Sequence, residues 1–110
     1  MKKTSISFLK ISLPKRKIQA LCKRWNISEL AIFGSALRED FTSESDIDIL
    51  VTFQKGVEWS LIDHIRMEEE LSQIIGRPVD LLTRRGVEQS RNWIRREAIL
   101  SSAEVVYASR

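Results

Sequence analysis

The chain has 110 residues, of which 43% are hydrophobic and 30% are charged, and its formal net charge is +3. This length fits one domain with one modest core, and the composition excludes a disordered chain. No apolar run approaches the roughly 18 residues that a membrane-spanning helix needs, so no membrane partner is expected. We expect residues 1–110 to form a single domain.

The charged residues are segregated along the chain. Residues 1–28 contain eight Lys and Arg and no acid, residues 29–80 contain twelve Asp and Glu against four basic residues, and residues 81–110 contain six basic residues against three acids. Two basic flanks around an acidic centre suit a divalent cation with a polyanion nearby, although solvated helix faces would give the same pattern. Aromatic and basic residues are not interleaved as in RNA-reading domains, so we do not expect nucleic-acid binding.

The N-terminal segment and the single cysteine indicate a cytoplasmic protein. Lys10 and three serines interrupt the apolar run of the first 15 residues, so we interpret this segment as mature chain rather than a signal peptide. Cys22 excludes an internal disulfide, and its place among apolar helix positions predicts a small, buried side chain.

Helices and strands are predicted to alternate through the first half of the chain. Pro14 opens a helix that ends near residue 26, because apolar residues then recur at helical spacing. The apolar run 30–33 predicts a short buried strand, and residues 35–45 predict a helical turn followed by a loop. Residues 46–53 are rich in β-branched side chains and predict a second strand.

The second half predicts a similar alternation. Residues 59–75 predict a helix that Gly76 ends, and residues 79–83 predict a third strand. Residues 87–100 predict one basic helix, and residues 104–108 predict a last edge strand. The apolar face of the helix over 59–75 is expected to consist of Leu61, Ile62, Ile65, Leu71, Ile74 and Ile75. This order predicts an α/β (α+β) fold, a sandwich in which helices flank a small mixed β-sheet.

Three aspartates occupy comparable positions in two of the predicted strands. Asp46 and Asp48 are two residues apart, so their side chains lie on one face of the strand, about 6.5–7 Å apart along the chain. Asp80 lies in the third strand between two apolar residues. Neighbouring carboxylates repel, and three such aspartates could converge on one or two Mg²⁺ ions. Taken singly, each could equally be a surface acid.

Gly34-Ser35 follows the first predicted strand where a helical turn begins. Glycine lets the backbone approach a phosphate, and a helix N-terminus with a serine hydroxyl supplies hydrogen-bond donors, although the same pair is common in plain turns. The GxxxxGK[ST] pattern of P-loop NTPases and the GxGxxG pattern of dinucleotide-binding domains are both absent.

The segment IFGSALREDFTSESDIDILVTF resembles the nucleotidyltransferase motif of the DNA polymerase β superfamily, G-S-x-A-R-G followed by S-D-x-D. The residues that match this motif are Gly34, Ser35, Arg38, Ser45, Asp46 and Asp48, with Asp80 as the third carboxylate. Within the superfamily the chain is most similar, over residues 28–83, to the minimal nucleotidyltransferases, the MNT partners of HEPN proteins in toxin–antitoxin pairs. Leu37 and Glu39 depart from the motif, and neither stands at a metal-ligand position.

The resemblance implies a role for each matching residue. Asp46 and Asp48 would hold Mg²⁺ against a nucleoside triphosphate, and Asp80 would complete the metal site and help to deprotonate the attacking hydroxyl. The phosphates would be contacted by residues of the Gly34-Ser35 turn. Arg38 would either counter phosphate charge or brace the acidic loop.

The implied reaction is the transfer of AMP from ATP to a hydroxyl, with release of pyrophosphate. The implied acceptor is a tyrosine of a HEPN-type toxin, with this chain as the antitoxin. Two alternatives stay open: a weak or inactive module that neutralises its partner by contact, and a nucleotidyltransferase for a small molecule. Self-association into a homo-oligomer also stays open.

Other conspicuous side chains are interpreted as structural or as interface residues. His64, the only histidine, is expected to be structural, and Trp25 and Trp59 are expected in the core or in an interface. Trp93, which lies among arginines, is the best interface candidate because Trp and Arg are enriched where proteins meet.

Overall fold

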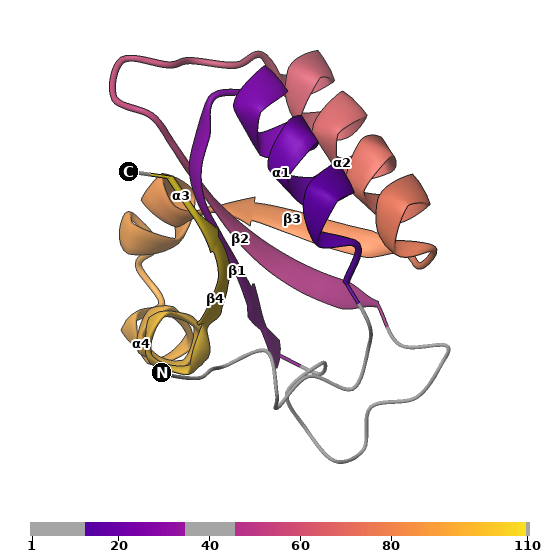
Figure 1. Ribbon diagram of the computed structural model, residues 1–110. Helices are drawn as coiled ribbons and strands as arrows, with labels where there is room; N and C mark the ends of the chain where they lie inside the picture. Colours follow the sequence, from indigo (N-terminus) through magenta and orange to yellow (C-terminus); the bar gives the residue numbers. More distant parts are fainter. Residues whose placement is uncertain (1–12, 35–45, 110) are drawn as a thin grey trace.

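The computed structural model describes residues 13–34 and 46–109, which form eight helices and strands (Figure 1). In chain order these are α1 (Lys15–Arg24), β1 (Ile27–Phe33), β2 (Ile47–Phe53), α2 (Leu61–Ile75), β3 (Val79–Thr83), α3 (Arg84–Glu88), α4 (Trp93–Ser102) and β4 (Glu104–Ala108). The turn and loop predicted for residues 35–45 lie outside the described residues. In the described ranges, no helix is long and apolar enough to cross a bilayer.

The strands form one mixed sheet, as the sequence predicted, and their order is β3-β2-β1-β4, which the sequence left open. β2 runs parallel to β3, whereas β1 runs antiparallel to both β2 and β4. β4 lies at one edge of this sheet, which confirms the predicted edge strand, and β3 lies at the other. The parallel pair β2–β3 brings two aspartate-bearing strands side by side.

Both faces of the sheet are covered by helices, at least in part. Figure 1 shows α1 and α2 on one face, with α3 and α4 on the other side of the sheet. The larger core lies under α1 and α2, where Ile47 and Ile49 of β2 are at most 2% exposed. The smaller core, between the sheet and α3 and α4, consists of Ala31, Phe33, Leu50, Val87 and Ile99. Cys22 is fully buried in the larger core, as predicted.

Side-chain alternation places the acids on the α3–α4 face. Because successive residues of a strand point to opposite faces, Asp48 shares a face with Leu50, and Asp80 shares it with Leu82. Leu50 belongs to the smaller core and Leu82 packs against it. Each strand therefore presents an aspartate at one end of this face and a leucine beneath the helices.

The predicted basic helix over 87–100 is wrong in one respect, because two helices replace it. α3 ends at Glu88, and α4 starts at Trp93 with its own cap. The Asn92 side-chain oxygen accepts a hydrogen bond from the backbone N–H of Arg95, 3.1 Å away. Asn92 therefore caps the N-terminus of α4, and α3 does not continue through it.

The predicted apolar face of α2 is also partly wrong. Leu61, Ile62 and Ile65 are between 47% and 75% exposed, whereas Met67 and Leu71 are fully buried. The stripe that contains Met67 and Leu71 passes, at helical spacing, through His64 rather than through Leu61. The helix itself ends at Gly76 in a left-handed conformation, as predicted.

Side chains of α2 bind the backbone of the edge strand β3. The backbone N–H of Leu81 donates to Glu68 Oε2 (2.8 Å), and the Nε2 of His64 donates to the carbonyl oxygen of Leu81 (2.8 Å). The backbone N–H of Val79 donates to Ser72 Oγ (3.1 Å). These bonds fix the residues on both sides of Asp80, and they confirm the structural role expected of His64.

Trp25 and Trp59 lie at the edge of the larger core, one of the two locations predicted for them, and they pack against each other. Their rings meet edge-to-face with centroids 5.0 Å apart. The indole N–H of Trp59 donates to the carbonyl oxygen of Trp25 (3.0 Å), and that of Trp25 donates to Glu70 Oε1 (2.7 Å). These bonds satisfy both indoles, which ties α1 to α2 and to the segment before α2.

Candidate active site

Asp48 and Asp80 are direct neighbours across the parallel strands. Their Cα atoms are register partners in the β2–β3 ladder, and Asp48 is also the partner of Phe33 in β1. Both lie beside a cavity of about 540 Å³ whose lining includes Gly34 and Arg95. Asp48 is half-buried and Asp80 is exposed. The structure therefore brings two of the three predicted acids to one cavity wall.

Gly34 lies directly against the Asp48 carboxylate. Its φ is +75°, in the left-handed region that favours glycine. A Cβ at this position would collide with Asp48 Oδ2 and would lie 3.2 Å from Asp48 Cγ. The end of β1 and the acid of β2 therefore meet with no room for a side chain between them, as expected if backbone atoms border a phosphate site.

Asp46 is placed differently from the other two acids. It lies one residue before β2, is exposed, and is not part of the cavity lining. β2 begins at Ile47, whose N–H donates to the carbonyl oxygen of Pro78 (2.9 Å). Within residues 13–34 and 46–109, no group of three His, Cys, Asp or Glu side chains is arranged to hold a metal ion. Convergence of all three aspartates stays a prediction.

Two predicted nucleotide-binding residues, Ser35 and Arg38, lie outside the described residues, as does Ser45 of the same motif. Their contacts with phosphate stay predictions, whereas the position of Gly34 at the cavity is established.

The chemistry of the cavity suits a hard cation and a phosphorylated ligand. Paired carboxylates supply the oxygen ligands that Mg²⁺ prefers, and a bound cation would relieve their mutual repulsion. Arg95 from α4 adds a permanent positive charge to the same cavity. From the sequence alone, Arg95 is one of the arginines around Trp93 and belongs to the predicted interface. The available signal was the basic segment that follows the strand of Asp80.

Comparison with known proteins agrees with this geometry. Residues 14–106 match the family model described as the nucleotidyltransferase domain. A candidate protein adenylyltransferase from Methanocaldococcus jannaschii is 42% identical over 69 residues, which cover 63% of this chain and 72% of that protein. Protein adenylyltransferase MntA from Thermococcus cleftensis is 39% identical over 62 residues, which cover 56% of this chain and 61% of that protein.

Solved structures share the fold. A candidate minimal nucleotidyltransferase superposes with a TM-score of 0.61 at 31% identity, covering 81% of this chain and 85% of that one. A toxin–antitoxin structure with AMP-PNP gives a TM-score of 0.66 at 18% identity, covering 89% and 76%. A complex of a tri-AMPylated Shewanella oneidensis HEPN toxin with its MNT antitoxin gives 0.57 at 18% identity, covering 86% and 70%.

Proposed function

This chain belongs to the nucleotidyltransferase domain family, and from that premise we propose that it transfers AMP from ATP to a hydroxyl group of a partner protein. The observation that carries the proposal is the pairing of Asp48 with Asp80 beside Gly34 in one cavity. Two neighbouring carboxylates and a glycine backbone suit a metal-bound triphosphate.

The carboxylates of Asp48 and Asp80 fit Mg²⁺ by their chemistry, and we assign Asp46 as the further ligand that the sequence motif implies. When bound, Mg²⁺ neutralises triphosphate charge and stabilises the charge that develops during phosphoryl transfer. Gly34, Ser35 and Arg38 are assigned to the phosphates.

In the proposed transfer step, Asp80 is the proton acceptor. The acceptor hydroxyl oxygen attacks the α-phosphorus of ATP, the bond from that phosphorus to the oxygen bridging to the β-phosphate breaks, and pyrophosphate leaves with the bond electrons. The hydroxyl proton passes to the Asp80 carboxylate, which is exposed and therefore accessible to an incoming acceptor. Asp48, half-buried against Gly34, holds the nucleotide side of the site.

We assign the acceptor as a tyrosine of a HEPN-type toxin and this chain as the antitoxin. The relatives named protein adenylyltransferases support AMP transfer to a protein. The structurally similar MNT antitoxin, bound to a tri-AMPylated HEPN toxin, supports the choice of partner. A free, buried Cys22 fits the reducing cytoplasm, where ATP is available.

The test is AMP transfer from ATP to a co-purified HEPN toxin in the presence of Mg²⁺, followed by intact-mass spectrometry. Asp48→Asn and Asp80→Asn should each lower the transfer rate by about 100-fold or more, because each removes a carboxylate from the reacting centre. Glu58→Gln, at an exposed position outside the cavity, makes the same loss of charge and should transfer at the parent rate.

Equal transfer rates for the parent and both aspartate variants would show that the site is assigned wrongly. A parent chain that neutralises the toxin without binding Mg-ATP, measured by calorimetry, would instead identify a contact-only antitoxin. Transfer to a small hydroxylated compound in the absence of any protein partner would identify the third alternative.

A further inference from the structure

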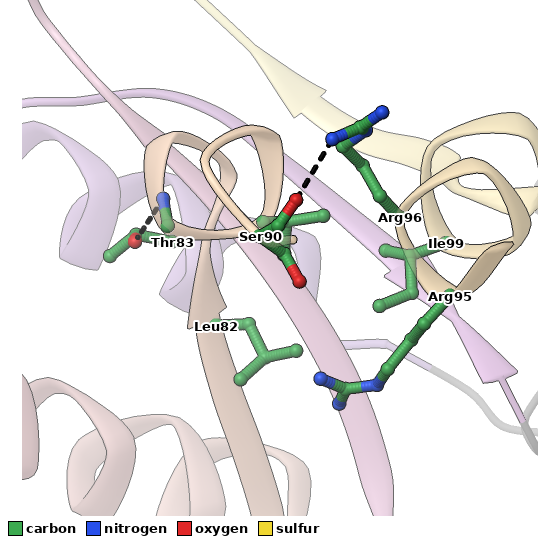
Figure 2. Close-up of a pocket in the computed structure, with 8 residues that line it drawn as sticks. Leu82, Thr83, Ser90, Arg95, Arg96 and Ile99 are labelled. Carbon is green, nitrogen blue, oxygen red and sulfur yellow. Dashed lines mark hydrogen bonds between the residues drawn. The ribbon is translucent and has the colours of Figure 1, made fainter. Parts of the chain in front are cut away.

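The acid-lined cavity has an immediate neighbour. A second cavity, of about 330 Å³, lies between β3, α3 and α4 (Figure 2). The two cavities share three lining residues, Leu82, Arg95 and Ile99. Arg95 therefore stands at their junction, with Asp48 and Asp80 on one side of it.

Two adjacent arginines of α4 have different roles. Arg96 is half-buried, and its Nη1 donates to the carbonyl oxygen of Ser90 (2.8 Å), so it braces the segment between α3 and α4. Figure 2 shows the Arg95 side chain on the other side of Ile99, extending toward Leu82. In the part of the chain that the structure describes, no carboxylate lies within ion-pair distance of Arg95. None of the described carboxylates therefore neutralises the charge of Arg95 in an ion pair.

The helix face that carries the exposed Arg95 is anchored against the sheet. Arg95, Ala98, Ile99 and Ser102 recur at helical spacing, and all four line the acid-bearing cavity. Ile99 is buried in the smaller core, which anchors this stripe against the sheet. The Asn92 cap holds the first turn through the N–H of Arg95 itself. Both the backbone and the helix face at Arg95 are therefore set by local structure.

We propose that Arg95 binds a phosphate group of the nucleoside triphosphate, a role that rests on the proposed function of the neighbouring acids. A triphosphate with one bound Mg²⁺ still has a net negative charge. The carboxylates of Asp48 and Asp80 repel that remaining charge, so a cationic side chain is needed to bind it. A guanidinium provides charge and a planar pair of donors that matches two phosphate oxygens. Arg95 is the arginine that the described cavity lining contains, and it shares that lining with both acids.

The test compares Mg-ATP dissociation constants by calorimetry. Arg95→Ala should weaken Mg-ATP binding about tenfold or more, the usual effect of removing a hydrogen bond to a charged group. Arg95→Lys should give an intermediate value, because it keeps the charge but loses the paired donors. Arg91→Ala, an exposed arginine outside both cavities, makes the same change of charge and should bind as the parent does.

A second readout separates phosphate binding from a structural role. Inhibition of AMP transfer by Mg-pyrophosphate should weaken in Arg95→Ala to about the same degree as Mg-ATP binding, while the thermal midpoint of unfolding stays within a few degrees of the parent. Equal Mg-ATP affinity in Arg95→Ala and Arg91→Ala overturns the proposal. A large loss of thermal midpoint that Arg95→Lys does not restore also overturns it.

Mg-ATP titrations of the Asp48 and Arg95 variants distinguish a failure of the role proposed for Arg95 from a failure of the proposed function. If Mg-ATP binding depends on Asp48 but not on Arg95, only the role of Arg95 is wrong. If the parent chain does not bind Mg-ATP, both proposals are wrong.

Discussion

Gly34 combines two requirements that exclude a side chain. Its positive φ disfavours any L-residue with a Cβ, and the Asp48 carboxylate occupies the space that a Cβ would need. Gly56 has a similar φ of +84° but has no atom within 4 Å of a Cβ position. The chain thus offers a natural comparison between backbone strain alone and strain combined with displacement of an acid.

Gly34→Ala should cost more stability than Gly56→Ala and should also reduce AMP transfer. The left-handed backbone alone costs about 1–2 kcal/mol for a residue with a Cβ. Gly34→Ala also displaces the Asp48 side chain, whereas Gly56→Ala displaces nothing. Only Gly34→Ala should therefore lower the rate of AMP transfer, by about tenfold or more. Urea unfolding and the AMP-transfer assay measure the two effects. Similar losses of stability with unchanged transfer in both variants would contradict this account.

Cys22 makes stability sensitive to alkaline pH. Burial raises the pKa of its thiol from 9.0 to about 12, because the thiolate is poorly solvated in the core. The unfolded chain loses this proton near pH 9 and the folded chain does not, so the contribution is fully present below pH 9. It is lost as pH rises from 9 toward 12.

The free energy of unfolding should therefore fall between pH 9 and pH 11, with Cys22 contributing up to about 1.4 kcal/mol per pH unit. Cys22→Ala lacks the thiol and should show a shallower slope, although it is less stable at pH 7 because a small cavity replaces the sulfur. Urea unfolding at several pH values gives both slopes. Parallel slopes for the two proteins would show that the thiol does not titrate differently on folding.

At the scale of the elements, α2 positions the strand that carries Asp80. Glu68 accepts the N–H of Leu81, and His64 donates to the carbonyl oxygen of the same residue. Glu68→Ala should lower the free energy of unfolding by about 1–3 kcal/mol, because it leaves a half-buried N–H group without its acceptor. Glu68→Gln keeps an acceptor oxygen and should retain most of the stability.

Glu69→Ala is the matched control, since Glu69 is the next residue of α2 and is exposed. It should change the free energy of unfolding by no more than about 0.5 kcal/mol. A loss at Glu69 as large as that at Glu68 would mean that charge on α2, rather than the bond to β3, stabilises the fold.

The strands and the positions of Asp48 and Asp80 could be predicted because their signals are local. Ile47, Asp48 and Ile49 alternate between the core and the cavity, and the glycine after β1 marks the end of that strand. The exposure of Leu61 and Ile62 could not be predicted, because it depends on how α2 is rotated against the sheet. The break between α3 and α4 was also missed, since its signal is the single capping side chain of Asn92.

At the scale of the whole molecule, the fold brings the acidic and basic segments of the sequence together at one cavity. The acidic centre contributes Asp48 and Asp80 to a cavity, and the basic C-terminal segment returns over the same face to contribute Arg95. Sequence order alone could not place Arg95 there, because the contact depends on how α4 packs through Ile99. The interface predicted at Trp93 stays a prediction, and its 63% exposure on α4 leaves the ring accessible to a partner.

The side-chain bonds from α2 to β3 also limit how an acceptor can approach. Many proteins capture an extended peptide by β-augmentation, in which the peptide pairs with a border strand of the sheet. Beside Asp80 this pairing is opposed, because Ser72 and Glu68 already accept the N–H groups of Val79 and Leu81, and His64 already donates to the carbonyl oxygen of Leu81. An acceptor whose hydroxyl reaches Asp80 is therefore expected to do so without strand pairing at Val79 and Leu81.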